Sequence, residues 1–481
     1  MQKRIISLII FFSIIFFFAI AFNISPFLRG PGEYIPDWRW PYYFVNTISK
    51  IWAPLLLITI LFGFIKKFDK NDAQIKNKEK KLITFLIIWA YLFIFSVLYF
   101  SRSGIFVLVE RIVNPGENGQ FTASLGITNI FSYLSNFNHI VSALEQHAKS
   151  HPPGGIVLFW FLNLIFQFFP KENFISNLVL HGSDFAMLWN GLLAGQKLTA
   201  VFSSILLPFL LTLPIIPIYY LGKLLFKAKT AFRSIAIYAV VPSVVFFVPL
   251  LDAFYSVFPL VSLILVIQGI TKRNLGFLFL SGMVMGLGLF FTFSITPYFL
   301  IYLITLIILL YQKQNLINLS GRVFKYYTAL LLGLSSFLIL CLFFLRINLM
   351  ETVFSIKLVY RSYFPWVFYN LYDFFIFTGI PVFILFVYLV KDFINKFLNY
   401  KAIKQNFLFL AFIITLITVD VLGVVRGETG RIYLFFVPIL VLLVAHFLTD
   451  KIKFNTKFFM IFMLIQLMQV LVMQEFWVML W

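Results

Sequence analysis

The sequence has a single cysteine, Cys341, in 481 residues, which excludes a disulfide within the chain and any cysteine-based metal cage. Charged residues are also scarce, because Asp, Glu, Lys and Arg make up 12% of the chain, whereas soluble domains carry about 25%. Hydrophobic residues make up 61%. So few charged side chains cannot cover that much apolar surface in water. The chain is therefore predicted to fold within a lipid bilayer.

Acidic residues are scarcer than basic ones, since 18 Asp and Glu stand against 38 Lys and Arg, a net charge of +20. A nucleic-acid-binding face is one explanation of this excess. The lysines, however, cluster in short stretches between apolar runs, as in 66–81 and 391–404. Positive charge held on cytoplasmic loops explains that pattern better. We therefore expect a multi-pass protein of the plasma (inner) membrane, surrounded by membrane lipids and without a nucleic-acid partner.

Long polar segments are absent as well, so one membrane domain is expected over 1–481. The run 4–23 has no small-residue cleavage site, so it is expected to be a retained first helix rather than a signal peptide. Segment 171–196 is moderately polar and is expected to cross or re-enter the membrane. The predicted fold class is all-α, a polytopic transmembrane helix bundle of about 13 to 14 spans with short interfacial helices on the outer face. The candidate spans are 4–23, 46–65, 82–100, 154–169, 198–222, 234–250, 255–270, 275–292, 296–311, 326–345, 371–390, 406–424, 432–448 and 457–475.

Lysine and arginine on alternate loops predict which loops face the cytoplasm. With Lys3, Arg4 and loop 66–81 inside, five segments fall on the outer side. The longest outer segment has apolar residues at helical spacing between Ile130 and Leu144, which predicts an amphipathic helix along the outer interface. The five outer segments are 24–45, 101–153, 251–254, 346–370 and 425–431.

Two acids, Glu33 and Asp37, stand four residues apart in the first outer loop, between Arg29 and Arg39. Pro31, Pro36 and Pro41 restrict the backbone around these acids. A carboxylate on such a stiff loop is a candidate general base, or a ligand of a divalent cation that prefers hard oxygen atoms. The alternative is an interfacial loop whose charges pair with one another and with lipid headgroups.

Two histidines, His147 and His151, precede a diproline in "HAKSHPPGG". Their spacing would place two imidazoles on one helix face, but Pro152 and Pro153 tend to end a helix at or before His151. A hydrogen bond to a phosphate or a sugar is therefore a better interpretation than a zinc site, and plain interfacial histidines remain the alternative. Asp252 lies in a very apolar setting. Such acids usually face a cavity and have a partner, although a turn acid at the headgroups would also fit.

The last cluster is "VVRGETGRIY", in which Arg426, Glu428 and Arg431 lie within six residues between two apolar runs. Two guanidiniums around one carboxylate can bind a phosphate, because arginine offers planar bidentate donors. Local pairing in a tight outer loop is the alternative. Arg346 and Arg361, with Lys357, add cations on the outer side, where lysine and arginine are disfavoured. An anionic lipid-linked phosphate would be a reason to keep them there.

These motifs in this order resemble the polytopic glycosyltransferases of the C-type superfamily, such as protein mannosyltransferases and lipid A aminoarabinose transferase. The resemblance rests on the acidic loop after the first helix, "HPPG" at 151–154, "VPSVVFFVPLLDAFYSV" at 241–257 and "RGETGRIYLFFVPIL" at 426–440. It implies an enzyme that moves a sugar from a polyprenyl-phosphate donor to a lipid-linked, glycan or protein acceptor at the outer membrane face.

The resemblance also implies roles for the candidate residues. The acid that the family carries in the first outer loop corresponds to Asp37 or Glu33. The residues expected to bind the leaving phosphate are Arg346, Arg361, Arg426 and Arg431, and Glu428 is expected in the same substrate-binding set. His147, His151 and Asp252 are expected to contact the sugar. The loop has no Asp-Asp or Asp-x-Asp pair, so the choice between the two acids stays open. A need for Mg²⁺ or Mn²⁺ stays open for the same reason.

Two other functions fit an apolar multi-pass chain. A secondary transporter or lipid flippase predicts paired inverted halves and acids near the midplane, but the sequence has no internal symmetry and its acids gather at one predicted face. An O-antigen polymerase or ligase also handles polyprenyl-linked sugars. Such proteins rely on a large outer loop late in the chain, whereas the largest outer segment of this chain, 101–153, lies early.

Overall fold

A computed structural model of the protein describes residues 2–32, 39–44, 46–70, 72–101, 104–145, 147–168, 186–311, 316–356, 361–395 and 406–477. Within these ranges every regular element is a helix, apart from an isolated bridge between Tyr42 and Trp477. Eight helical stretches are at least 18 residues long and apolar enough to cross a bilayer. The predicted all-α polytopic bundle is therefore confirmed.

Each spanning stretch consists of one helix or of consecutive helical segments. A ninth is added if α21 (Tyr363–Thr378) and α22 (Ile380–Ile394), which bend by 116° at Gly379, count as one span. The eight are Gln2–Ala21 (α1), Ile48–Phe68 (ending in α2, Trp52–Phe68), Glu79–Tyr99 (α4), Ala194–Leu225 (α11, Ala194–Leu210, and α12, Ile215–Leu225), Asp252–Lys272 (α15, Asp252–Tyr255, and α16, Val257–Lys272), Asn318–Leu345 (most of it in α19, Leu316–Leu340), Thr429–Lys451 (α25, Thr429–Ile432, and α26, Val437–His446) and Thr456–Phe476 (α27).

The other helices are shorter. Four are apolar and 10–17 residues long: α9 (Gly154–Phe166), α17 (Leu275–Phe291), α18 (Tyr298–Leu310) and α24 (Phe407–Leu422). The remaining α-helices are α3 (Asp72–Asn77), α5 (Val107–Val113), α6 (Gln120–Ser124), α7 (Ile130–Ser135), α8 (Phe137–Ile140), α10 (Ala186–Gly191), α13 (Ala228–Tyr238), α14 (Pro242–Phe246) and α20 (Leu349–Ser355). Tight 3-10 turns lie at Pro26–Arg29, Ile48–Lys50, Gly104–Phe106, Val141–Ala143, Ala148–Ser150 and Tyr433–Phe436, and π-helical turns at Cys341–Leu345 and Phe447–Lys451.

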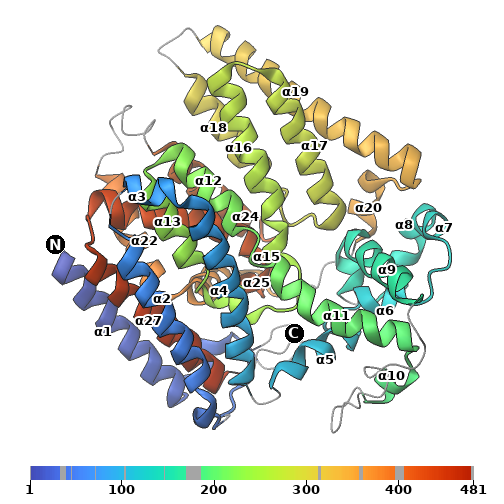
Figure 1. Cartoon of the computed structure of the whole chain (residues 1–481). Helices are drawn as coiled ribbons and strands as arrows, with labels where there is room; N and C mark the ends of the chain where they lie inside the picture. Colours follow the sequence, from blue (N-terminus) through green and yellow to red (C-terminus); the bar gives the residue numbers. More distant parts are fainter. Residues whose placement is uncertain are drawn as a thin grey trace.

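The helices pack in three groups (Figure 1). Helices α16, α17, α18 and α19 pack against one another, while α1 packs on α27 and on α22, and α2 packs on α4. The third group joins α5 and α9 to α11, and α6 to α9. The short helices α15 and α25 lie between these groups. Residues from distant parts of the chain therefore meet at the centre of the molecule.

Three expectations about single segments differ from the structure. The expected span 371–390 is broken at Gly379, where α21 and α22 bend by 116°. The expected span 234–250 is divided, because α13 ends at Tyr238 and a separate short helix begins at Pro242. Proline lacks an N–H group and disfavours helical backbone in the residue before it, and Pro249 prevents α14 from continuing. The expected amphipathic helix of 101–153 is likewise divided into α7, α8 and short turns. Much of segment 171–196 lies outside the described residues.

Three helices begin at the same end of the molecule. Gln2, in the first turn of α1, donates hydrogen bonds to backbone oxygens just before α27. Thr456, the first residue of α27, donates to the backbone oxygen of Asp69 at 2.9 Å. Glu79, the first residue of α4, forms an ion pair with Lys223 at 2.6 Å. We call this the basic end, because it gathers the lysine-rich stretch 66–81 and the lysines that follow α12.

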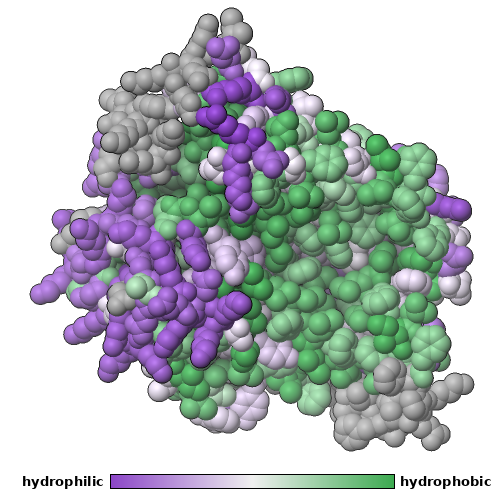
Figure 2. All heavy atoms as spheres, turned by 45° about the horizontal axis from the view of Figure 1, so that its top comes forward, coloured by the Kyte–Doolittle hydropathy of each residue, from purple (hydrophilic) through white to green (hydrophobic). Residues whose placement is uncertain are grey.

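The opposite ends of α1 and α27 also lie together. The Tyr42 hydroxyl donates to the backbone oxygen of Ala21, the last residue of α1, at 2.7 Å. The backbone N–H and the hydroxyl of Thr47 donate to the carboxylate of Glu475, near the end of α27, at 3.1 and 2.8 Å. Figure 2 shows hydrophilic side chains gathered at one side and a broad hydrophobic surface over much of the rest of that face. This distribution is typical of a protein surrounded by lipid.

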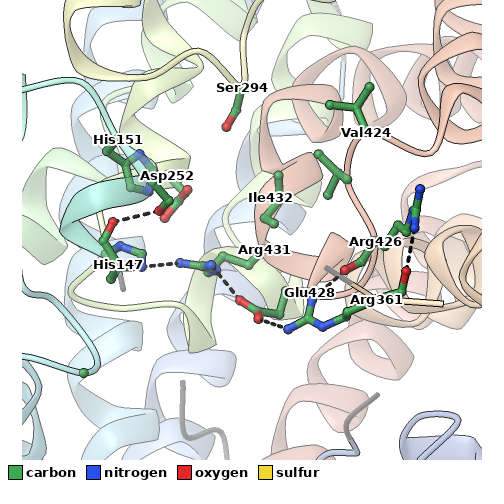
Figure 3. Close-up of a pocket in the computed structure, with 13 residues that line it drawn as sticks. His147, His151, Asp252, Ser294, Arg361, Val424, Arg426, Glu428, Arg431 and Ile432 are labelled. Atoms are coloured by element: carbon green, nitrogen blue, oxygen red, sulfur yellow. Dashed lines mark hydrogen bonds and ion pairs between the residues drawn. The ribbon is translucent and has the colours of Figure 1, made fainter. Parts of the chain in front are cut away.

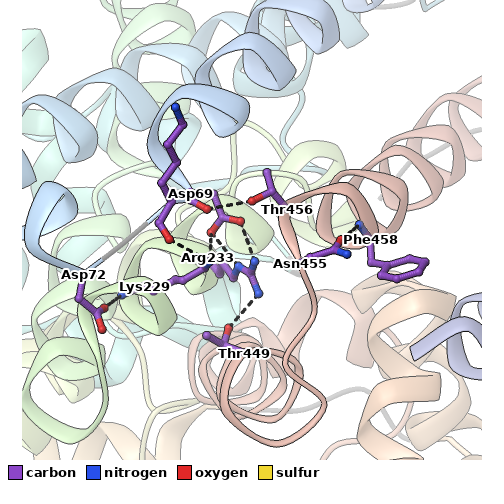
Figure 4. A network of polar contacts seen from close by, with 9 residues as sticks. Asp69, Asp72, Lys229, Arg233, Thr449, Asn455, Thr456 and Phe458 are labelled. Atoms are coloured by element: carbon purple, nitrogen blue, oxygen red, sulfur yellow. Dashed lines mark hydrogen bonds and ion pairs between the residues drawn. The ribbon is translucent and has the colours of Figure 1, made fainter. Parts of the chain in front are cut away.

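A buried ion pair fastens the basic end (Figure 4). The guanidinium of Arg233 in α13 donates to both carboxylate oxygens of Asp69 at 2.8 and 2.6 Å, and neither side chain is exposed. Lys229 lies 3.8 Å from the same carboxylate. Paired bidentate geometry of this kind is what allows charges to be buried. The pair joins the end of α2 to α13 and, through the Asp69 backbone, to α27.

The bend between α21 and α22 is supported by two glutamines of α27. Gln469 accepts a hydrogen bond from the Ile380 N–H at 2.8 Å and donates to a backbone oxygen of α21 at 2.8 Å. Gln466 donates to the Thr378 oxygen at 2.7 Å. Gly379 has φ +109°, and a side chain there would collide with Gln466. The bend is thus satisfied inside the protein, as broken helices in membranes require.

Candidate substrate cavity

A cavity of about 220 Å³ lies where four of the predicted outer segments meet (Figure 3). Segments 101–153, 251–254, 346–370 and 425–431 all contribute to its wall. The side chains on one flank are imidazoles and a carboxylate, and those on the other are guanidiniums around a second carboxylate. The lining residues are Gly116, His147, Ser150, His151, Asp252, Ser294, Arg361, Val424, Val425, Arg426, Glu428, Arg431 and Ile432.

The "HPPGG" sequence forms the corner that carries the histidines. A short 3-10 turn, Ala148–Ser150, ends at His151, and α9 begins directly after the diproline. The first turn of α9 needs glycine, because a Cβ on Gly154 would lie 2.6 Å from a backbone oxygen of Phe290 and one on Gly155 would collide with the Gln120 side chain. The prolines therefore end the preceding turn, and the glycines allow α9 to pack closely against α6 and α17.

The two imidazoles lie together at this corner, with ring centroids 4.8 Å apart. Burial, aided by Arg431 and opposed by Asp252, lowers the pKa of His151 from 6.5 to about 4. Burial, Arg431 and His151 hold the pKa of His147 well below its usual range. Both rings are therefore neutral near pH 7. The Nδ1 atom of His151 is buried and has no hydrogen-bond partner in the described part of the chain.

Asp252 starts α15 beside the histidines and is 7% exposed. It lines the cavity, and within the described ranges its carboxylate makes no hydrogen bond or ion pair. The segment before it is fixed by Arg111 of α5, whose guanidinium donates to the Phe246 oxygen at 3.3 Å and to the Val248 oxygen at 2.6 Å. Asp252 is thus an acceptor held on a supported turn, suited to hydrogen-bond hydroxyl groups of a ligand.

Glu428 lies between two guanidiniums on the other flank. Arg361 donates to one of its carboxylate oxygens and Arg431 to the other, each at 2.6 Å. Burial alone raises the pKa of Glu428, but Arg431 and Arg361 outweigh it and leave the pKa below its usual value. The carboxylate is therefore ionised at neutral pH. It orients the two guanidiniums while neutralising only one of their charges.

The loop that carries these arginines is tied to its neighbours. Arg426 donates to the backbone oxygens of Arg361 at 2.6 Å and Gly423 at 2.9 Å, and Arg361 donates back to the Arg426 oxygen. Asn370 in α21 accepts from the Gly427 N–H at 2.9 Å. Three guanidiniums and one carboxylate leave this flank with a net positive charge, so it is suited to hold an anion.

Asp373 joins this loop to the first outer loop, and the sequence reasoning missed it. One carboxylate oxygen accepts from the Gly430 N–H at 2.7 Å and from the Thr429 hydroxyl at 3.3 Å, and the other accepts from the Trp40 indole at 3.4 Å. The position of Asp373 in the apolar run "YNLYDFFIFTG" is the signal that would have found it, because acids in such runs usually have a partner.

The first outer loop is closed at its base next to Asp373. The Trp40 N–H donates to the Arg29 oxygen at 2.8 Å, and Arg39 donates to the Gly30 oxygen at 3.0 Å. The two acids predicted as catalytic, Glu33 and Asp37, lie outside the described residues, as does Lys357. The described residues on either side of these acids nevertheless lie beside Asp373, whose carboxylate accepts the hydrogen bond from Gly430.

Seven of the eight predicted substrate-binding residues therefore surround one cavity: His147, His151, Asp252, Arg361, Arg426, Glu428 and Arg431. The eighth, Arg346, follows the π-helical turn that ends α19 and does not line the cavity. Among the described residues no group of three or more His, Cys, Asp and Glu side chains could hold a metal ion. The cavity itself offers one carboxylate that is not paired with arginine, which does not fit the oxygen-rich coordination of Mg²⁺, so we derive no step through a metal.

Comparisons with known proteins add no family to this geometry. No protein-family model matches the chain, and no characterised protein and no solved structure matches it either.

Proposed function

We propose that the protein is a glycosyltransferase that takes a sugar from a polyprenyl-phosphate donor and passes it to a lipid-linked, glycan or protein acceptor. The observation that carries the proposal is the two-sided cavity. One flank holds Arg431, Arg361 and Arg426 around a single carboxylate, and the other holds Asp252 with two neutral imidazoles. A donor of this class has the same two parts, an anionic phosphate and a sugar rich in hydroxyl groups.

Each flank has a role in the proposed transfer. The guanidiniums bind the phosphate and stabilise the negative charge that grows on it as the bond from the anomeric carbon breaks. The electron pair of that bond stays on the departing polyprenyl phosphate. Asp252 accepts hydrogen bonds from sugar hydroxyls, and the neutral imidazole of His151, which lines the same cavity, contacts the sugar beside it. Glu428 keeps the guanidiniums in place.

The acceptor hydroxyl must lose a proton while its oxygen bonds to the anomeric carbon. We propose Asp37 or Glu33 as the base, as the resemblance implies. Support comes from the loop base, because Trp40 and Gly430 are held by the same carboxylate, that of Asp373. The Asp373 side chain thus links Trp40, at one end of the loop, to Gly430, the residue before Arg431.

The proposed setting is the plasma membrane, with the cavity on the extracytoplasmic side. The lysine-rich stretches gather at the basic end, which the positive-inside rule assigns to the cytoplasm. Tyr42, two residues beyond Trp40, bonds the last residue of α1, at the end of that helix far from the lysines. A lipid-linked sugar present on the outer face would therefore have access to the cavity.

The test is a transfer assay with the purified full chain in lipid vesicles. A panel of polyprenyl-phosphate sugars is supplied with candidate acceptors, and release of polyprenyl phosphate is measured for the wild type, Asp37→Asn and Glu33→Gln. The proposal expects release with one donor class and a loss of about 100-fold or more in one of the two variants. Intact donor that changes sides of the membrane without cleavage would instead identify a flippase.

A further inference from the structure

A second, larger pocket lies between α1 and α22, away from the substrate cavity. Its volume is about 510 Å³, within the range of roughly 300–1,000 Å³ typical of ligand pockets. The lining is apolar except at one end. The lining residues are Leu8, Phe12, Ile380, Phe383, Ile384, Val387, Tyr388 and Lys391.

The residues of the pocket form one stripe on each helix. On α22 they recur at spacings of three and four from Ile380 to Lys391, so they share one face of the helix. On α1, Leu8 and Phe12 are four residues apart, and Arg4 precedes them by one further turn on the same face. Each apolar stripe therefore ends in a cation.

The two cations lie at the basic end of the molecule. Arg4 is in the first turns of α1, whose start bonds the residues before α27, and Lys391 is in the last turn of α22. Both side chains are exposed, and within the described residues neither forms an ion pair. Phe12, Phe383 and Val387 are exposed at 49%, 36% and 49%. The groove is thus apolar along its length and carries two exposed cations at one end. A lipid with a hydrocarbon chain and an anionic headgroup is complementary to such a groove.

We propose that this groove, formed by α1 and α22, binds an anionic phospholipid of the leaflet at the basic end. One acyl chain lies along the apolar stripes, and Lys391 and Arg4 hold the phosphate. The 116° bend at Gly379 sets the direction of α22 and so leaves the groove open beside α1. The lipid then ties the first helix to α22. This inference does not depend on the proposed glycosyltransferase activity.

The test is native mass spectrometry of the full chain released from an equal mixture of phosphatidylglycerol and phosphatidylcholine with identical acyl chains. We expect one retained lipid, with phosphatidylglycerol preferred. Each cation near a membrane surface contributes a factor of about five to anionic lipid binding, so Lys391→Ala should lower that preference about fivefold, and Arg4→Ala/Lys391→Ala further. Lys66→Ala is the matched control, because Lys66 is an exposed lysine in the last turn of α2 at the same end.

A second variant tests the groove itself. Val387 is an exposed residue of the apolar stripe, so Val387→Trp places a large side chain in the groove. This variant should no longer retain the lipid, while the thermal stability of the detergent-solubilised protein stays near that of the wild type. Equal retention of the two lipids by the wild type, or equal effects of Lys391→Ala and Lys66→Ala, would overturn the proposal. A protein dimer that Val387→Trp dissociates would also overturn it, since a second copy would then fill the groove.

Discussion

Arg431 and His147 are 284 positions apart in the chain, yet a guanidinium nitrogen of Arg431 lies 3.2 Å from His147 Nδ1. Arginine can only donate, so the imidazole nitrogen accepts and the ring proton sits on Nε2. The same guanidinium also donates to Glu428. A single side chain thus connects the imidazole flank of the cavity to its arginine flank, which makes the geometry of one flank dependent on the other.

His147→Ala should weaken phosphate binding, because Arg431 loses one of the two partners that orient it. A hydrogen bond to a charged group contributes about 1.5–3 kcal/mol, so we expect a loss of roughly 10- to 100-fold in affinity for polyprenyl phosphate. Equilibrium binding of that lipid to the detergent-solubilised protein measures it. His139→Ala is the control, since His139 is an exposed histidine of α8 that does not line the cavity. Equal effects of the two substitutions would contradict the assignment.

Stability should fall as the pH drops below about 6.5. The pKa of His151 is lowered from 6.5 to about 4 by burial, so between these values the unfolded chain binds more protons than the folded one. Its contribution is fully present above pH 6.5 and is lost as the pH falls toward 4. At pH 5 the loss is about 2 kcal/mol. Thermal unfolding of the wild type and His151→Gln at pH 7.5 and 5 measures this, and the variant should lose less stability. An unchanged pH dependence would contradict the prediction.

The buried pair at the basic end should dominate the stability of that end. Asp69→Asn leaves the Arg233 guanidinium buried without its charge partner, at a cost of about 3–5 kcal/mol in the free energy of unfolding. Lys223→Ala is the matched control: it breaks the Glu79 ion pair, whose lysine is 37% exposed, and exposed pairs contribute about 1 kcal/mol or less. Thermal unfolding in detergent compares them. Similar melting temperatures for the two variants would refute the structural role of Asp69.

Asp373 should couple the first outer loop to the arginine loop. Asp373→Asn puts an NH₂ group where a carboxylate oxygen now accepts from Gly430 N–H or the Trp40 indole, so one donor loses its partner. The first outer loop and the arginine loop are then no longer held in a fixed relative position. We therefore expect kcat for transfer to fall by about 10-fold or more, with a smaller change in the binding of polyprenyl phosphate. Asn370→Ala, on the same helix and bonded to the arginine loop, should weaken binding as well. A loss of binding in Asp373→Asn equal to the loss of kcat would indicate a general structural defect instead.

The sequence predicted a membrane protein, and the gathering of its sparse polar residues, better than it predicted the bounds of individual helices. Apolar length and loop charge follow from the bilayer itself, so the all-α bundle could be predicted. The division of 234–250 could not, because that stretch is enclosed by protein and is not required to cross lipid as one helix. Its prolines were visible, but their effect depends on neighbours such as Arg111, which bonds the Phe246 and Val248 oxygens.

The candidate cavity was predictable where charges stood out against apolar surroundings, as at Asp252 and Arg431. Asp373 stood out equally but lies within an apolar run, where no loop boundary marked it. The sequence could not show that Arg346 lies outside the cavity lining, because the turn that follows α19 determines the position of this residue. Sequence spacing shows which residues are unusual for a membrane segment, and packing decides which of them meet.

The most direct measurement is sugar transfer from a polyprenyl-phosphate donor by vesicles holding the wild type, Arg431→Gln or Arg346→Gln. The two arginines belong to predicted outer loops, but only Arg431 lines the cavity. Losing one preorganised donor to developing negative charge typically costs about 100- to 1,000-fold in kcat. Arg431→Gln should therefore lose that much activity while Arg346→Gln stays within a few-fold of the wild type. No transfer from any donor by the wild type, or equal activity of the two variants, would contradict the account.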